Sequence, residues 1–293
     1  MNSTYLLEQL INGICQGAIY ALVAIGYTMI VGVVGLVSLC YGETVMVGAF
    51  VSYLTFTLIG TSIPLAFAVS FVGTAVLGAL LHKICYEPFL ESPRHICVMC
   101  TIGASIFLKN VVQLMTKSET KAVPRIFGAG YFTVSQIRVA YVQVAILAIV
   151  ILLSLALSFF LNKTRTGIML KAISQDRKAA SLVGINVKLA TLLGNMLGCG
   201  LGGIAGMLYS VYYSAFQATM GGPIGIKAFS ASVLGGLSDI PVAATGGMTI
   251  GVLENFGVAF FSSGYRDLIA FIFLITILVW KPHGLSFNFK RGA

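Results

Sequence analysis

The residues of this sequence that could do chemistry are few and widely separated. Two glutamates, Glu43 and Glu254, lie at the start of one apolar segment and well inside another. Serine and threonine are plentiful, but no histidine or acidic residue is placed beside one of them to act as a base, as nucleophilic catalysis requires. We therefore expect no catalytic residue in this chain, and an enzyme is disfavoured.

Cysteine and histidine do not form the pattern of a metal site. Cys97 and Cys100 make a C-x-x-C, a spacing found in redox pairs and zinc sites. No second pair accompanies it, and His82, His95 and His283 never cluster in the sequence. Cysteines within apolar segments most often act as small buried hydrophobes. We expect neither a metal nor any other cofactor.

The densest charge of the chain falls in one interval, residues 163–188. We expect a short helix over residues 174–184 within it, because both ends carry a signal. Ser174 is a good N-cap, Asp176 suits the first turn of a helix, and Gly184 offers a C-terminal stop. The interval holds six basic residues, Lys163, Arg165, Lys171, Arg177, Lys178 and Lys188.

Two interpretations of this interval stay open. It could be a solvated basic loop that only sets the orientation of a membrane protein. It could also be a docking element for a cytoplasmic partner, since it carries an apolar surface that a solvated loop does not need. In that case Asp176, Arg177 and Lys178 would set the register, and Ala179, Ala180 and Leu182 would supply contact area.

The composition determines the class of protein. Of 293 residues, 58% are hydrophobic and only 9% are charged, far less charge than a soluble domain needs on its surface. Uncharged runs separate Glu8 from Glu43 and Lys188 from Lys227, and a membrane span needs about 20 apolar residues. We expect an all-α polytopic membrane protein. The net charge of +9 fits basic loops between spans and does not indicate nucleic-acid binding.

The apolar segments predict about eight transmembrane helices plus a short re-entrant or half-spanning helix at 223–236. The uncharged run 189–226 would extend about 57 Å as one helix, nearly twice the bilayer core of about 30 Å. It must therefore break, and the Gly-Gly-Pro at 221–223 is where we expect the break. The eight segments lie near 10–35, 43–60, 63–82, 95–115, 140–161, 188–213, 240–261 and 265–281.

The basic residues also predict an orientation. If 163–188 is cytoplasmic, the loop 83–94 and the tail from Lys281 join it, and the three together carry most of the Lys and Arg. The C-terminus is then inside and the N-terminus outside.

Within such a membrane, each glutamate has two possible roles. A carboxylate at membrane depth is costly and is a candidate for function, so Glu43 and Glu254 are expected to line a translocation path. Alternatively, Glu43 compensates a helix dipole, and Glu254 forms a buried structural pair with Lys227 or Asn255.

Glycine marks a face for helix packing. Gly194, Gly198, Gly202 and Gly206 recur at every fourth position, which places them in one stripe along a helix. Stripes of small residues let helices approach closely in lipid. We expect this face to contact neighbouring helices in a tight bundle.

Three parts of the sequence together resemble one family. They are the charged loop KAISQDRKAASLVGINV, the opening GAIYALVAIGYTMIVGVVGLVSLCYGETVMVGAF, and a C-terminal third that contains SVLGGLSDIPVAATGGMTIGVLENFG and SSGYRDLIAFIFLITILVWKPHGL. The chain is similar, nearly end to end, to the branched-chain amino acid (Liv-type) ABC importer permeases. Where that family often has an Asn-Phe-Ala-His-Gly-Glu-like run, this chain has Ser-Leu-Cys-Tyr-Gly-Glu at residues 38–43.

The resemblance implies the following expectations. The chain, residues 1–293, would be a single transmembrane permease domain in the bacterial inner membrane, with a cytoplasmic coupling loop at about 163–188. Its partners would be a second related permease, two cytoplasmic ATPases, an extracytoplasmic solute-binding protein and the lipid bilayer, but no nucleic acid. The chain has no G-x-x-x-x-G-K-[ST], so ATP chemistry would lie in a partner. A urea- or amide-type permease and a stand-alone transporter or channel remain alternatives.

Overall fold

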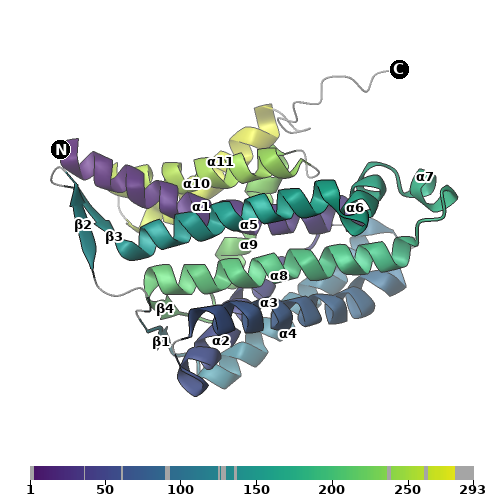
Figure 1. Cartoon of the computed structure of the whole chain (residues 1–293), viewed down its shortest axis with the longest axis horizontal. Coiled ribbons are helices and arrows are strands. Elements are labelled where there is room, and N and C mark those ends of the chain that lie inside the picture. Colours follow the sequence, from purple (N-terminus) through teal and green to yellow (C-terminus); the bar gives the residue numbers. More distant parts are fainter. Residues whose placement is uncertain are drawn as a thin grey trace.

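The computed structural model describes residues 3–35, 37–60, 62–89, 93–124, 126, 130–134, 137–235, 239–260 and 263–280. These residues form an elongated bundle whose helices run mainly along its long axis (Figure 1). The helices are α1 (Ser3–Val34), α2 (Tyr41–Leu58), α3 (Ile63–Leu81), α4 (Arg94–Thr116), α5 (Tyr141–Lys163), α6 (Arg165–Gln175), α7 (Arg177–Leu182), α8 (Val187–Tyr213), α9 (Gly221–Leu234), α10 (Ile240–Phe260) and α11 (Arg266–Trp280).

The predicted all-α polytopic membrane fold is confirmed. Each of the eight long apolar segments corresponds to one helix, and the short segment corresponds to α9. Within the described part of the chain, five spans are long and apolar enough to cross a membrane by themselves: Tyr5–Val34, Ile63–Phe89, His95–Thr116, Tyr141–Lys163 and Val187–Tyr213. The first and last of these are largely buried inside the protein, whereas the other three expose most of their surface.

Two small antiparallel sheets, which the sequence did not predict, lie at one end of the bundle (Figure 1). In the first, β1 (Lys121–Ala122) pairs with β4 (Ala215–Phe216), which joins the end of α4 to the end of α8. In the second, β2 (Tyr131–Val134) and β3 (Ile137–Ala140) form a hairpin before α5. We call this the strand end of the molecule and the opposite one the α7 end.

The loops are distributed between the two ends as the charge pattern predicted. At the α7 end, the loop after α3 meets the start of α8, where His82 Nε2 lies 3.0 Å from Thr191 Oγ1. At the strand end, Gln143 at the start of α5 donates a hydrogen bond to Asn12 near the start of α1. The first residues of α1 therefore lie opposite α6 and α7 (Figure 1). The tail from Lys281 lies outside the described residues.

The long uncharged run 189–226 breaks, but earlier than expected. α8 ends at Tyr213, and Ser214 follows in the left-handed conformation with φ of 52°. Gly221 and Gly222 do not form the break; they begin the next helix, α9, whose 14 residues extend only about 21 Å. The prediction of a short helix was right and its break point at 221–223 was wrong, because β4 occupies the connection.

The bare face of α8 lies against α1 and α2. A Cβ on Gly194 would come within 2.9 Å of Val33, and one on Gly198 within 2.7 Å of the Gly26 carbonyl oxygen, both on α1. Further along, Gly202 faces the Tyr41 ring and Gly206 faces the backbone at Val45, both on α2. The stripe thus lies between two neighbouring helices and leaves no room for side chains.

Candidate functional site

Helix α2 begins in the middle of the bundle and not at its end. α1 ends at Val34, and α2 begins seven residues later, at Tyr41. There the Tyr41 hydroxyl donates a hydrogen bond to the Val23 carbonyl at 3.0 Å and lies 3.4 Å from the Gly198 carbonyl. Because Val23 and Gly198 belong to the middle of α1 and α8, the N-terminus of α2 is inside the protein.

Helix α9 begins beside it and runs the opposite way. Gly221 lies so close to Gly42 that a Cβ on Gly42 would overlap the Gly221 carbonyl oxygen. α2 leads toward the strand end, where Phe50 packs against β4. α9 leads toward the α7 end, where Thr28 donates a 2.8 Å hydrogen bond to Ser232. The N-termini of two half-helices therefore meet inside the bundle, and we call this point the α2–α9 junction.

Glu43 lies at this junction, in the first turn of α2. Its side chain is only 4% exposed, and Oε2 has no hydrogen-bond partner among the described residues. That oxygen occupies the place where a Cβ on Gly221 would be. Ser105 and Lys109 of α4 are the side chains that act electrostatically on the carboxylate. Both predicted roles of Glu43 fit this geometry, since helix N-termini attract an anion and an unsatisfied buried oxygen can accept a further donor.

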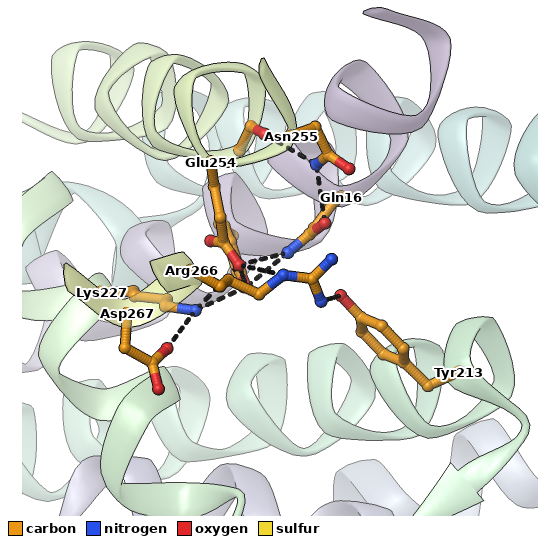
Figure 2. Close-up of polar contacts among 9 residues, drawn as sticks. Gln16, Tyr213, Lys227, Glu254, Asn255, Arg266 and Asp267 are labelled. Atoms are coloured by element: carbon orange, nitrogen blue, oxygen red, sulfur yellow. Dashed lines mark hydrogen bonds and ion pairs between the residues drawn. The ribbon is translucent and has the colours of Figure 1, made fainter. Parts of the chain in front are cut away.

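Glu254 has the opposite environment, with many partners and no exposed surface (Figure 2). Its Oε1 accepts hydrogen bonds from Gln16 Nε2 at 3.0 Å, Tyr20 hydroxyl at 3.3 Å and Lys227 Nζ at 3.1 Å. Arg266 Nε lies 3.1 Å from the same oxygen as an ion pair. A single carboxylate oxygen thus holds together side chains from α1, α9, α10 and α11.

Three further contacts connect the partners of Glu254 to other side chains. Lys227 Nζ also pairs with Asp267 at 3.0 Å, and Asn255 donates a 2.7 Å hydrogen bond to Gln16. Arg266 Nη1 donates a 2.7 Å hydrogen bond to the Tyr213 hydroxyl at the end of α8. Two cations and two carboxylates balance, so the cluster is neutral. This arrangement favours the buried structural pair over a place for Glu254 in a translocation path.

Sequence reasoning found only part of this cluster. Lys227 was an expected partner of Glu254 and is one, whereas Asn255, also expected, donates its hydrogen bond to Gln16. Gln16, Tyr20 and Arg266 were not expected. A signal existed for the first two, because Gln16 and Tyr20 are polar, lie four residues apart in an otherwise apolar helix and hydrogen-bond each other at 2.7 Å. Nothing in the sequence indicates that Arg266 reaches back to Glu254.

At the α7 end, the charged interval folds into two helices where one was expected. Ser174 is not an N-cap: it lies inside α6, and its hydroxyl bonds the Lys171 carbonyl within the same helix. Asp176 ends α6 and caps α7, accepting hydrogen bonds from the backbone N–H groups of Lys178 and Ala179 at 2.8 and 3.0 Å. The predicted boundary failed because Asp176, two residues later, satisfies the N–H groups of its own helix.

Helix α7 ends where the sequence predicted. Gly184 has φ of 86°, a conformation in which glycine meets no Cβ penalty. Its N–H donates to the Ser181 carbonyl, and the next N–H, of Ile185, donates to the Ala180 carbonyl. This pair of hydrogen bonds is the Schellman arrangement of a helix C-terminus.

The face that α7 offers to a partner differs from the predicted one. Ala180 is 5% exposed and buried within this chain, so it cannot supply contact area to another subunit. Leu182 and its neighbour Val183 are 88% and 81% exposed, and Lys178 and Ala179 are exposed as well. Ser181 is exposed too, so the outward surface of α7 and the residue that follows it consists of Lys178, Ala179, Ser181, Leu182 and Val183.

Arg177, which is half-buried, contacts the end of α1. Its Nη2 donates a 2.8 Å hydrogen bond to the Val33 carbonyl and a second hydrogen bond to the Val34 carbonyl. Burial lowers the pKa of the guanidinium below its ordinary value, although arginine stays charged in proteins. That Arg177 sets the register with a partner stays a prediction, and this contact gives the side chain a second role within the chain.

Comparison with known proteins shows that the chain matches one family over most of its length. Residues 9–278 match the family described as "Branched-chain amino acid transport system / permease component". The chain is 35% identical to the high-affinity branched-chain amino acid transport system permease protein BraD of Pseudomonas aeruginosa, over 95% of each chain. It is 35% and 34% identical to the corresponding LivH proteins of Salmonella typhimurium and Escherichia coli, over 96% of this chain and 95% of each relative. No solved structure matches the chain significantly.

Proposed function

This chain belongs to the family of branched-chain amino acid transport system permease components, and from that premise we propose that it carries branched-chain amino acids across the membrane. The chain is the transmembrane permease subunit of an ABC-type importer, a multi-pass protein of the cell membrane and not itself an enzyme. ATP hydrolysis takes place in separate subunits. The substrate proposed here is the one in the names of BraD and LivH.

An ABC importer permease works with ATPase and solute-binding partners. We propose the specific assembly of this chain with a second related permease, two cytoplasmic ATPases and one extracytoplasmic solute-binding protein. Residues 1–293 would act in it as a single permease domain. The exposed apolar residues of α4 and α5, among them Leu114 and Leu152, support contact with lipid or with the second permease.

The α2–α9 junction is the part of the chain that we assign to the translocation path. An amino acid crosses as a zwitterion, and both its charges need polar groups at a depth where water is excluded. The junction supplies both kinds: Glu43 for the ammonium group, and the N-termini of two half-helices for the carboxylate, as in other transporters with broken helices. The observation that carries this assignment is that Glu43 is buried where α2 and α9 begin and belongs to none of the ion pairs found among the described residues.

Helix α7 is the part that we assign to ATPase docking. Its capped ends make it a defined helix at the α7 end, and its outward surface leaves Leu182 and Val183 exposed to water. Apolar side chains exposed outside the membrane are expected where another protein covers them.

Reconstitution tests the proposed substrate. The permease, with its second permease, ATPases and binding protein, is placed in proteoliposomes, and uptake of radiolabelled leucine is followed with and without ATP. We expect ATP-dependent leucine uptake that unlabelled isoleucine and valine inhibit and urea does not. Uptake of urea or a short-chain amide without uptake of leucine would overturn the substrate, and leucine uptake by this chain alone would overturn the ATP-driven mechanism.

A further inference from the structure

The end of α1 carries backbone groups that need a partner. The last carbonyls of a helix have no N–H within the helix to accept, and they form the negative end of its dipole. α1 ends at Val34, and Gly35 follows with φ of 68° as the chain turns back. The carbonyl oxygens of Val33 and Val34 therefore need hydrogen-bond donors from another part of the chain.

Arg177 satisfies both carbonyls from another helix. Its Nη2 donates to Val33 O and Val34 O, and a Cβ on Gly35 would lie 3.7 Å from its guanidinium carbon. None of the ion pairs found among the described residues includes Arg177. Its hydrogen bonds to the backbone of α1 join residues 143 and 144 positions apart in the sequence.

On one side of this contact is the proposed ATPase-docking helix. Arg177 is the first residue of α7, directly after the capping Asp176. Ala180, one turn later, is buried as well, and α7 packs against α6 and α8. A displacement of α7 would therefore move the Arg177 side chain with it.

On the other side is the segment that leads to the α2–α9 junction. Only residues 35–40 separate the end of α1 from the first residue of α2. Within that segment Ser38 and Cys40 are buried, and Tyr41 is fixed by its hydrogen bond to Val23. The turn that Arg177 holds is thus the base of the segment that carries Glu43.

We propose that Arg177 is a positioning residue that transmits movement of α7 to the end of α1 and to residues 35–43, and so couples the ATPase cycle to the junction. This inference rests on the proposed docking of α7 to an ATPase. An arginine suits the role because one guanidinium can bridge two carbonyl oxygens with directed N–H groups, whereas the ammonium of a lysine is a point charge. Arg177 is then needed for coupling and not for binding of the ATPase.

The test separates coupling from docking in the reconstituted complex. Arg177→Gln is compared with Lys117→Gln, which removes one charge from an exposed position at the strand end, outside the docking helix. We measure co-purification of the ATPase, ATP hydrolysis, leucine uptake and thermal stability. We expect Arg177→Gln to keep the ATPase bound and active, and to lower leucine uptake per ATP by about tenfold, a typical size for the coupling between two sites. Lys117→Gln should retain the normal ratio.

A second variant keeps the test decisive if Arg177→Gln folds poorly. Arg177→Lys retains the cation at the end of α1, so the protein should fold, but it should lower uptake per ATP to an intermediate value. An unchanged ratio in both Arg177 variants would overturn the inference, and so would loss of the ATPase from them while Lys117→Gln retains it. If the unmodified permease binds no ATPase at all, the docking proposal fails and this inference fails with it.

Discussion

Two buried glutamates of this protein have contrasting surroundings. Glu254 has four partners within 3.3 Å on one oxygen and belongs to a neutral cluster that joins several helices. Glu43 lies where α2 and α9 begin, and none of the ion pairs found among the described residues includes it. Each glutamate has one oxygen, Oε2, without a hydrogen-bond partner among those residues, so the difference lies in the cations that Glu254 Oε1 binds. Both residues are buried acids in apolar segments, so from the sequence both are candidates for the translocation path, each with its own structural alternative.

The contrast indicates which carboxylate holds the fold and which is available to a passing solute. A carboxylate that already binds two cations and two polar groups gains nothing from another ammonium, and removing it leaves buried charges unbalanced. Glu43 belongs to none of the ion pairs found among the described residues, so its carboxylate can bind a transient cation and release it again. We therefore expect stability to depend on Glu254 and transport to depend on Glu43.

The largest expected effect is the loss of stability in Glu254→Gln. This change leaves Lys227 and Arg266 with only Asp267 to balance them, at a cost of about 3–5 kcal/mol for a broken buried pair. In thermal unfolding of the detergent-solubilised protein, that cost corresponds to a fall in Tm of about 10 °C. Glu119→Gln, at an exposed carboxylate of the strand end, serves as the control.

The double variant Glu254→Gln with Lys227→Met sharpens this test. Removing both charges of a coupled pair costs less than the sum of the two single changes, so part of the lost Tm should return. A Glu254→Gln protein with unchanged Tm would contradict the structural role and erase the contrast between the two glutamates.

The next effect is on transport. Glu43→Gln removes a buried charge that has an unsatisfied oxygen, so the Tm should stay within about 2 °C of the original, since little paired energy is lost. Leucine uptake should fall by about tenfold or more, the equivalent of one charge-assisted hydrogen bond of at least about 1.5 kcal/mol. If Glu43→Gln loses stability and retains uptake, then Glu43 only compensates the dipoles of the helices, as the alternative interpretation held.

The helices of this fold could be predicted because their signals are local and strong. The apolar lengths specify α1 to α5 and α8 to α11, and the length of the run 189–226 required a break. Gly184 and Asn186 mark the end of α7 and the start of α8 through hydrogen bonds within their own turns. The exact break after Tyr213 could not be predicted, because a two-residue strand pairing with Lys121–Ala122 has no recognisable pattern.

The candidate site was predictable only in its residue types. Glu43 and Glu254 stand out in any apolar sequence, but their partners come from distant helices. Gln16 and Glu254 are 238 residues apart, and the inward turn of Arg177 depends on where α1 ends. Ala180 and Leu182 lie two positions apart in a six-residue helix, yet only tertiary packing decides that the first is buried and the second exposed.

A smaller effect is expected from packing around the junction. Gly202 of α8 faces Tyr41, the first residue of α2, and a Cβ there would lie 2.8 Å from its hydroxyl oxygen. Gly202→Leu therefore overfills this contact, at a cost of about 1–3 kcal/mol or about 5 °C in Tm. Gly103→Leu on α4 is the matched control, because a Cβ at Gly103 meets nothing within 4 Å. Equal Tm values for the two variants would show that the junction tolerates loose packing.

The smallest effect is expected at the outer face of α7, which touches neither glutamate. Leu182 is 88% exposed, so Leu182→Ser should leave the Tm unchanged. If an ATPase covers this side chain, its affinity should fall by about fivefold, or about 1 kcal/mol, a moderate value for one interface residue. Titration of the reconstituted permease with the ATPase measures this change, and Leu114→Ser, at an equally exposed leucine on α4, should have no effect. If Leu182→Ser leaves the affinity unchanged, the basic interval 163–188 serves only to orient the protein in the membrane. Movement of an ATPase could then not be transmitted through α7 to Glu43.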